Sequence, residues 1–393
     1  MPTTSGEGGT TTVACAAALH SLGEATLTEL SRATGLSRPT VRERLNELGS
    51  LVEITSGADH RESPTPSGGR PASRFRFRGE YGFVVGAEIT RHDERIVVCD
   101  IGGRICHYSE HHDAETLPGR ERIAAFKKRL NHIVSRLSTG HERWLGVGLA
   151  LTGGIGADGW ISHSPVFPDL WGCAPADAGL SFGDVPLRVE HDLNAAAMAE
   201  YVYGAARGAG TFAHVLAWHQ IAAGIVLNGR VHRGSHNLAG ELGHFDDGSR
   251  APASWEDVAT FLPVVEAAAR GDVVSAADLD AFADATARQI AYLALAIDPD
   301  LVVLGGPLVH SSAFTDRVGR TVQTLLRRAY PLDLTITRFP RLGPSLGALQ
   351  LALNGAFGDL LGDVSFPARI DVRPLSRLAT ADHHHRRGSA ITV

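Results

Sequence analysis

Two apolar stretches that end in paired glycines constrain the fold of this chain more than any other feature. They read WLGVGLALTGGI at residues 144–155 and DPDLVVLGG at residues 298–306. Each predicts a buried strand followed by a glycine-rich turn. Because strands and helices surround both stretches in a similar order, the sequence favours a two-lobed α/β protein. We expect the first lobe at residues 81–204 and the second at residues 205–365, with the last helix returning to the first lobe.

Each lobe also contains an antiparallel strand pattern. Residues 81–112 predict a meander of strands with a double-glycine turn, and an amphipathic helix follows at residues 121–137. In the second lobe, residues 214–234 predict a strand pair with an Asn-Gly hairpin signal. Residues 366–393, which include the run DHHHRRGSAITV, have the composition of a flexible tail.

The composition is that of a soluble protein. The chain has 393 residues, of which 44% are hydrophobic and 20% are charged, so two or three domains with large cores are expected. It has no apolar run of transmembrane length and no signal-peptide pattern, which predicts a cytoplasmic protein without membrane contact. The net charge of −6 argues against a protein that coats nucleic acid over its whole surface. The four cysteines form no CxxC pair, which argues against a disulfide framework.

Residues 1–80 form a separate segment that predicts a winged helix-turn-helix. The predicted elements are helices at 12–22, 27–34 and 37–48 and strands at 51–55 and 73–78. Gly35 allows a tight turn between the last two helices, and Ser37 can cap the next helix. The apolar side chains expected on the inner faces are Leu27, Leu30, Ala33, Val41, Leu45 and Leu48. A helical hairpin in another role is the alternative, but the strand pair that follows favours a winged helix.

The outer face of the third helix carries residue types that read DNA. The candidate contacts in this helix and its cap are Ser37, Arg38, Thr40, Arg42 and Arg44. Arginine can bind guanine through two hydrogen bonds, and threonine can contact a thymine methyl group. In the predicted wing, the run GGRPASR holds Arg70 in an extended stretch that can enter an A·T-rich minor groove. On charge alone, the arginines of residues 61–78 favour a solvated loop over a phosphate-binding cluster.

The stretch VEHDLNAAAMAEYVYGAARG, residues 189–208, places a carboxylate where a strand ends and a helix begins. Asp192 at that junction could take a proton from a substrate hydroxyl or could only hold the hydroxyl.

Several motifs together resemble the ROK family of repressors, open reading frames and sugar kinases. They are VEHDLNAAAMAE, AGIVLNGRVHRG, LAGELGH, DPDLVVLGG and, at the end of the first segment, GGRPA. The resemblance covers residues 12–356 and is strongest to the repressor branch, of the xylose and N-acetylglucosamine repressor type. It implies a winged helix joined to an actin-like body of the sugar-kinase and Hsp70 type.

The resemblance also implies a set of sugar-binding residues. In the family's kinases, the aspartate that matches Asp192 is the base for the sugar hydroxyl. The residues that match Glu241, His244 and Glu256 bind the sugar. Carboxylates that accept hydrogen bonds from hydroxyl groups suit this recognition. Without the resemblance, Glu241 and His244 would be interpreted as surface or capping residues.

The phosphate-binding loops depart from the kinase pattern. The first loop of the family reads Asp-x-Gly-x-Thr, whereas this chain has Glu88, Thr90 and His92 at those positions. Glycine lets backbone N–H groups approach phosphates, and β-branched threonine resists that geometry. The second loop, normally Gly-Thr-Gly, reads HQIAAG. Only LGG at residues 304–306 matches the family's adenosine site, and it could equally be a turn without a ligand. We therefore expect Asp192 to be a vestigial base that holds a hydroxyl.

Two further departures concern metal and ligand. The family's zinc site has one histidine, matching His244, and three cysteines that this chain lacks; Asp246 and Asp247 are poor replacements for thiolates. We predict neither zinc nor any cofactor. Val166 and His191 stand where the family commonly has asparagines near the sugar. The pocket could therefore favour a different sugar, a phosphosugar or no sugar.

These observations predict a DNA-binding transcriptional regulator, by analogy a repressor, of carbohydrate metabolism. It would bind a double-stranded operator as a homodimer or homotetramer and respond to a sugar in the cleft between the lobes, without being an enzyme. One alternative is an active ATP-dependent sugar kinase with a DNA-binding segment. The other is a regulator with a vestigial cleft that responds to a protein partner.

Overall fold

The computed structural model describes most of the chain. The described residues are 7–55, 72–113, 117–137, 143–164, 166–218, 221–242, 265, 267–268, 270–326, 330–362, 369–375 and 390–392. Within these ranges, none of the helices combines the length and apolar character that crossing a membrane requires.

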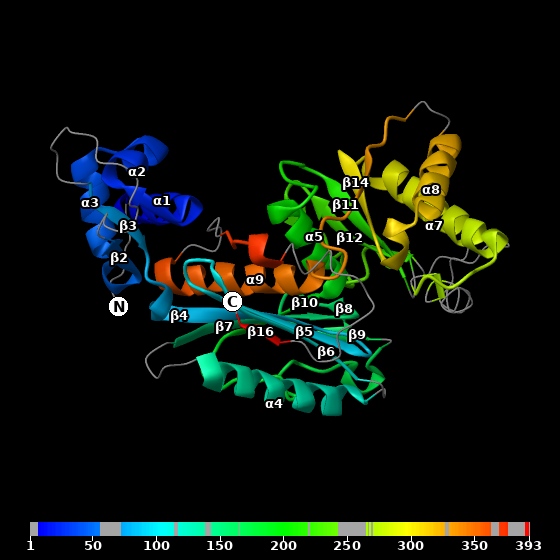
Figure 1. Cartoon of the computed structure of the whole chain (residues 1–393), viewed down its shortest axis with the longest axis horizontal. Helices are drawn as coiled ribbons and strands as arrows, with labels where there is room; N and C mark the ends of the chain where they lie inside the picture. The colour runs from blue at the N-terminus through cyan, green and yellow to red at the C-terminus, as the bar shows by residue number, and fades with distance from the viewer. Residues whose placement is uncertain are drawn as a thin grey trace.

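The N-terminal module consists of three helices and a small antiparallel sheet, at the left of Figure 1. Its helices are α1 (Glu7–Leu22), α2 (Leu27–Thr34) and α3 (Arg38–Glu47), and a 3₁₀ turn spans Gly49–Leu51. Its strands are β1 (Glu24–Thr26), β2 (Val52–Thr55) and β3 (Arg74–Phe77), with β3 in the centre. The three helices and two of the strands were predicted. Strand β1, which has only three residues, was not predicted.

Local capping explains where these helices begin and end. The Thr26 hydroxyl accepts a hydrogen bond from the Glu29 N–H while the Glu29 carboxylate accepts one from the Thr26 N–H, which caps α2. Gly35 ends α2 with φ of 74°, and the Ser37 side chain caps α3 as predicted. The predicted inner face is confirmed for all but one of its residues. Ala33 is exposed, because it lies on the solvent side of the last turn of α2.

A six-stranded mixed sheet forms the first half of the body. Its order is β10-β7-β4-β5-β6-β16, and β4, β7 and β10 run parallel. The strands are β4 (Gly82–Ile89), β5 (Asp93–Asp100), β6 (Ile105–His112), β7 (Arg143–Leu151), β10 (Leu187–His191) and β16 (Ala390–Thr392). Helix α4 (Gly119–Leu137) covers one face, and α9 (Gly343–Leu361) covers the other (Figure 1). A hairpin of β8 (Gly154–Ile155) and β9 (Ile161–His163) follows β7, and 3₁₀ turns span Gly79–Tyr81 and Pro168–Leu170.

A five-stranded mixed sheet forms the second half. Its order is β13-β12-β11-β14-β15. The strands are β11 (Phe212–Ala217), β12 (Ile221–Leu227), β13 (Arg230–Val231), β14 (Leu301–Gly305) and β15 (Leu334–Ile336). Helices α7 (Ala276–Ile297) and α8 (Ser312–Leu325) cover one face, with a 3₁₀ turn at Pro307–His310, and α5 (Asp192–Tyr203) packs on the other face. The predicted strands of both halves are confirmed.

Helices α5 and α9 pack against each other between the two sheets (Figure 1). A Cβ at Gly347 of α9 would overlap the carbonyl oxygen of Ala195 in α5. A Cβ at Gly148 of β7 would likewise overlap the carbonyl oxygen of Ala348, and one at Gly224 of β12 would meet α5. Glycine is therefore needed at these three close approaches.

The expected flexible tail, residues 366–393, is wrong for the part of it that the structure describes. Ile370 and Leu375 are buried against the core that α1 and α9 share. Residues Ala390–Thr392 form β16 and pair with β6. The composition of this segment indicated solvation, but Ile370 and Leu375 are buried and the backbone of Ala390–Thr392 pairs with β6.

His20 joins the N-terminal module to the body. The side chain, on α1, is 4% exposed and packs edge-on against Phe77 and Phe357. Its Nδ1 accepts a hydrogen bond from the Arg369 N–H at 3.1 Å, so its Nε2 carries the proton and donates to the Ile101 carbonyl, also at 3.1 Å. Burial lowers the pKa of His20 to about 4, although the bond to Ile101 opposes that shift. The ring is therefore neutral in the folded protein.

This neutral joint makes stability depend on pH. Because the pKa of His20 is depressed on folding, its contribution is complete above the unfolded value of about 6.5 and is lost as the pH falls toward about 4. This loss of unfolding free energy can reach about 3 kcal/mol. We expect His20→Gln, which keeps one donor and one acceptor but cannot take up a proton, to abolish it. Urea unfolding of both proteins from pH 7.5 to 4.5 measures it. Parallel pH profiles would contradict this account.

The helix crossing predicts opposite effects of one substitution at two helical glycines. Gly347→Ala should destabilise the protein by about 1–3 kcal/mol, because the new methyl group meets backbone. Gly319→Ala in α8 meets nothing within 4 Å and should stabilise by about 0.5–1 kcal/mol. Thermal unfolding compares them. Equal shifts in Tm would show that the crossing tolerates a Cβ.

Candidate functional site

Three parallel strands of the first sheet end at the same edge. The register pairs Ile89 with Leu151 and Leu151 with His191, which are the last residues of β4, β7 and β10. The residues that follow them therefore lie side by side at this edge, among them Thr152 and Asp192. Ligands of open α/β sheets bind at the carboxyl ends of such strands.

Asp192 is the first residue of α5, and its carboxylate already accepts three hydrogen bonds. The Thr152 hydroxyl donates to Oδ2 at 2.7 Å. The Leu193 N–H donates to Oδ1 at 2.8 Å, and His191 Nε2 lies 3.1 Å from the same oxygen. A carboxylate has about four acceptor positions, so one remains for a ligand. The arrangement suits holding a single hydroxyl.

His191 lies between two carboxylates. Its Nε2 is 3.1 Å from Asp192 Oδ1 and 3.7 Å from Glu241 Oε1. Burial lowers the pKa of His191, but the hydrogen bond to Asp192 and the two negative charges outweigh burial, so the pKa is raised above its ordinary value. The ring is therefore held toward its charged form. The three side chains are 7%, 14% and 7% exposed, for His191, Asp192 and Glu241 respectively.

The backbone before Glu241 fixes where its side chain lies. Gly240 has φ of 91°, and a Cβ there would overlap the carbonyl oxygen of Ala223. The Ala223 N–H donates to the Gly240 carbonyl at 2.8 Å. The LAGE motif therefore lies directly on β12, and only glycine allows that approach.

Glu190 supports the site from behind. It is 1% exposed, forms an ion pair with Arg233, and accepts hydrogen bonds from the His191 N–H and the Asn194 side chain, both at 3.0 Å. These contacts tie the end of β10 to α5 and to the chain after β13. The Glu190 carboxylate therefore has hydrogen-bond and ion-pair partners within the chain.

The turn between β4 and β5 is closed on itself. The Thr90 N–H donates to the Asp93 carbonyl at 2.9 Å, and the Asp93 N–H donates to the Thr90 hydroxyl at 3.0 Å. Burial raises the pKa of Glu88, and the nearby charge of Asp192 adds to that shift. Arg95 partly offsets it through an ion pair at 2.9 Å. The polar groups of this turn therefore have partners within the chain.

The glycine-rich turn after β14 has a packing role. Gly306 has φ of 119°, and a Cβ there would overlap the carbonyl oxygen of Ala217 at the end of β11. Ile221, in the middle of the altered second loop, is fully buried in the first position of β12. The LGG motif is thus explained by a close approach of two strand ends.

The predicted DNA-contacting residues differ in exposure. Arg38 and Arg42 are exposed, and neither forms an ion pair within the described part of the chain. Thr40 is half-buried, and its hydroxyl lies 2.8 Å from that of Ser37, the exposed cap. The Arg44 side chain is only 16% exposed and pairs with Glu43 and Glu47. Arg44 is therefore held along the helix.

Of the four predicted sugar-binding residues, the structure describes two, Asp192 and Glu241, and it brings both to the strand-end site. His244, Glu256 and the predicted minor-groove residue Arg70 lie outside the described residues, as do Asp246, Asp247, His219 and Gln220. Among the described residues, no three side chains of the types that bind metals gather in one place. Thr152 was not predicted as a site residue, although it follows a buried strand that runs parallel to the strand before Asp192.

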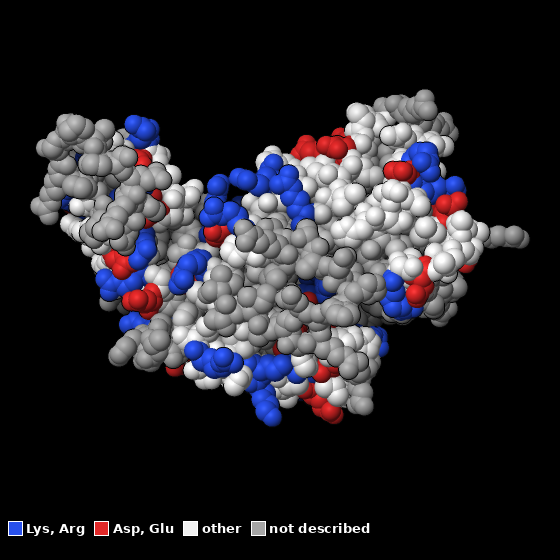
Figure 2. Space-filling model, in the orientation of Figure 1, with Lys and Arg blue, Asp and Glu red and all other residues white. Residues whose placement is uncertain are grey.

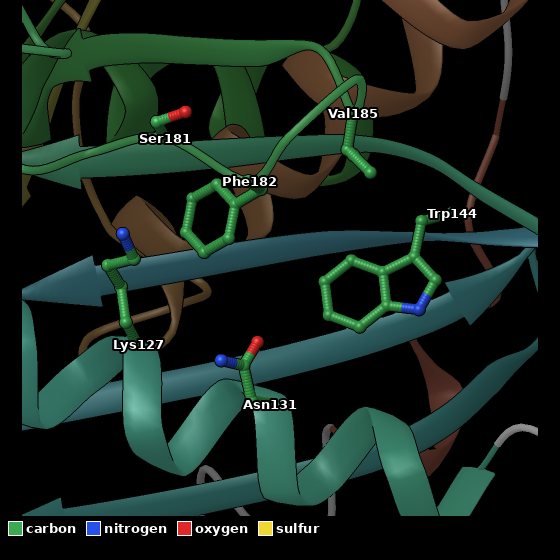
Figure 3. Close-up of a pocket in the computed structure, with 6 residues that line it drawn as sticks. All are labelled: Lys127, Asn131, Trp144, Ser181, Phe182 and Val185. Carbon is green, nitrogen blue, oxygen red and sulfur yellow. The ribbon is translucent and has the colours of Figure 1, made fainter.

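A groove of about 600 Å³ lies elsewhere, on the outer face of the first sheet. Figure 3 shows its lining, with Lys127 and Asn131 on α4 and Phe182 and Trp144 opposite. Trp144 lies near the start of β7, whereas Thr152 follows its end. Lys127 donates to the Gly179 carbonyl at 2.9 Å and lies over the Phe182 ring. Figure 2 shows Lys and Arg side chains at the bottom of the view, where Figure 1 places α4. The groove is separate from the strand-end site.

Comparison with known proteins gives the family. A model described as "ROK family" matches residues 84–254 and 248–354. The xylose repressor of Bacillus subtilis (strain 168) is 25% identical over 220 residues, which are 55% of this chain and 55% of the repressor. The chain thus spans about half the length of that relative.

Two solved structures show the fold. A ROK family transcriptional regulator, described as a homologue of the Escherichia coli MLC protein, has a TM-score of 0.67 at 18% identity and covers 90% of this chain and 100% of its own. A ROK family glucokinase from Streptomyces griseus, in complex with glucose and AMPPNP, has a TM-score of 0.55 at 19% identity over 69% of this chain and 99% of its own. The expected actin-like α/β body of the sugar-kinase type, with mixed sheets, is confirmed. Because the matched ranges together run from residue 84 to residue 354, the chain belongs to the ROK family.

Proposed function

We propose that this protein is a sugar-responsive transcriptional repressor without kinase activity. The observation that carries the proposal is a continuous set of contacts from the strand-end site to the N-terminal module. A relative named as a xylose repressor supports the regulatory role. The family also contains kinases, such as the glucokinase of similar fold, so the absence of phosphoryl transfer is part of the proposal.

The segment 369–375 makes the connection. The Arg369 N–H donates to His20 of α1, and the next N–H, of Ile370, donates to the Tyr203 hydroxyl at 3.2 Å. Tyr203 is the last residue of α5, and Asp192 is the first. One helix therefore joins the candidate ligand site to the segment that holds α1. A ligand that shifts α5 would move the N-terminal module by way of this segment.

We propose that the N-terminal module is a winged helix-turn-helix with α3 as its recognition helix. Its three helices and three-stranded antiparallel sheet support this assignment. Arg38, Thr40 and Arg42 would contact the operator, and Arg70 would enter the minor groove. The ion pairs of Arg44 suit a role in holding α3 in position. An operator with two half-sites requires two recognition helices, so we propose a homodimer or homotetramer.

The site supports binding over phosphoryl transfer. The Asp192 carboxylate already accepts three hydrogen bonds. Thr90 and Asp93 form hydrogen bonds with each other within their turn. Phosphoryl transfer depends on positioning and neutralising the phosphates, which requires donors that are free to meet them. Asp192 and Glu241 would accept hydrogen bonds from ligand hydroxyls, and His244 and Glu256 would complete the set.

Operator contacts can be tested by comparing Arg42, on the proposed recognition helix α3, with Arg136, on α4. We expect Arg42→Ala to weaken binding to a selected operator by about 5–150-fold, since a base contact contributes about 1–3 kcal/mol. Arg136→Ala, on the exposed side of α4, removes the same charge and should leave affinity nearly unchanged. The operator is first selected from random duplexes, and binding is measured by fluorescence anisotropy. Equal losses in both variants would show non-specific attraction only.

The sugar response can be tested at Asp192. A panel of aldoses should include one that weakens operator binding at least tenfold, and Asp192→Asn should abolish that response while leaving binding without sugar unchanged. The reason is that the amide places a donor where the carboxylate accepts. A coupled assay should detect no sugar-dependent ATP consumption. Turnover lost in Asp192→Asn would instead identify a kinase.

A further inference from the structure

Four exposed arginines gather where the end of α5 meets the segment 369–375. Arg207 follows α5, Arg338 follows β15, and Arg369 and Arg373 belong to the segment itself. Neither the strand-end site nor the proposed recognition helix uses them. Because the chain as a whole has a net charge of −6, this local excess of positive charge needs an explanation of its own.

The buried carboxylate of Glu200 brings two of the four arginines together. Glu200 lies in the last turn of α5 and is 1% exposed. It accepts a hydrogen bond from the Arg338 N–H at 2.9 Å and another from the N–H of Ala205, two residues before Arg207, at 2.7 Å. The loop after β15 and the turn after α5 therefore meet at one carboxylate, and both arginines are exposed there.

The other two arginines lie in the segment that holds α1. The Arg369 N–H donates to His20 of α1, and the N–H that follows it donates to the hydroxyl of Tyr203 at the end of α5. The side chain of Arg373 is 88% exposed and pairs with Asp371. The four arginines are therefore located at the joint between the body and the N-terminal module.

Positive charge exceeds negative charge at this joint. Arg207, Arg338 and Arg369 form no ion pair within the described part of the chain, whereas Arg373 has Asp371 as its partner. Figure 2 shows Lys and Arg side chains on the body's side of the hollow between the body and the N-terminal module, near the place where Figure 1 draws the segment 369–375. Like charges that lie close together repel each other, and an anion placed against them relieves this repulsion.

DNA is the anion that this position fits. Helix α3 has ten residues and is about 15 Å long, whereas one helical turn of DNA covers about 34 Å. Phosphates on either side of the recognition helix are therefore left for other parts of the protein to bind. Arginine suits this task because its planar guanidinium group binds a phosphate through two hydrogen bonds. The arginines beside α1 lie next to the module that would hold the duplex.

We propose that the body has a second DNA contact, which binds operator phosphates beside the half-site read by α3 and consists of Arg207, Arg338, Arg369 and Arg373. This inference rests on the proposed function for the operator itself. The second contact sets affinity without reading bases, since phosphate contacts carry no direct sequence information. It lies at the end of α5 opposite Asp192, so a ligand that shifts α5 would also move these arginines relative to the DNA.

The test measures how DNA binding depends on salt, because that dependence counts phosphate contacts. The patch variant is Arg207→Gln/Arg338→Gln/Arg369→Gln in the full-length protein, which leaves the ion pair of Arg373 intact. Each lost contact reduces the slope of log K against log salt concentration by about 0.9. We expect the slope to fall by about 2–3 and affinity at low salt to fall at least about tenfold, for a selected operator and for an unrelated duplex alike. Fluorescence anisotropy measures both quantities.

Two matched variants control for charge and for folding. Arg136→Gln/Arg230→Gln/Arg320→Gln removes the same charge from exposed positions on α4, β13 and α8, and it should leave the slope nearly unchanged. The lysine variant, with lysine at the three patch positions, keeps the charge and should retain the slope of the wild type. Thermal unfolding of all variants shows whether the fold is kept.

Duplex length gives a second measurement that uses the unaltered protein. If the body binds phosphates beside the half-site, lengthening the DNA outward from a single half-site should strengthen binding by the wild type and then have no further effect. The patch variant should gain less from the added length. A wild type that gains nothing from the added DNA would overturn the second contact, even where the patch variant is unstable.

The outcomes separate this inference from the proposed function. Equal reductions in slope in the patch and control variants would show general attraction only and would overturn the inference. An unchanged slope in a folded patch variant, or weakened binding by a folded lysine variant, has the same meaning. In each case, selective operator binding that is lost in Arg42→Ala leaves the proposed function standing. A wild type that binds no duplex would overturn both.

Discussion

The close packing of α5 against α9 is the constraint on which the rest of the structure depends. Each helix lies on a different sheet, and glycines remove the side chains that would hold them apart: Gly347 faces Ala195, Gly148 faces Ala348 and Gly224 faces Leu193. Because packed interiors move between discrete arrangements, a shift of one helix must be accommodated by the other. A shift of either helix therefore moves the residues at its ends. Asp192 begins α5, and Phe357 near the end of α9 packs against His20.

Much of the fold could be predicted from local patterns. The buried strands with glycine exits, the meander and the capped helices each leave a periodic or turn signal within a few residues. Elements that depend on distant partners left no such signal. Strand β1 has three residues and exists because it pairs with β3, some fifty positions later. The segment 369–375 is apolar at only a few positions, and its partners His20 and Tyr203 lie far away in the sequence.

The candidate site could be predicted only in part for the same reason. Asp192 was identifiable because it stands at a strand-to-helix junction, and Glu241 through its motif. Thr152 required the knowledge that β7 and β10 are parallel neighbours in register. The outer-face position of Arg44 did not predict its ion pairs with Glu43 and Glu47. An arginine on that face can bind either DNA or a nearby acid of the same helix.

The acids at the strand ends lie close to positively charged groups of the same chain. Each has a cation of this chain beside it: Arg95 for Glu88, Arg233 for Glu190, and His191 for Asp192 and Glu241. A site for phosphoryl transfer has charges and donors that the metal and nucleotide complete. In the described part of this site, cations of the chain itself lie beside these acids. Asp192 keeps an acceptor position at the start of α5, and Tyr203 at the other end of α5 contacts the segment that holds α1.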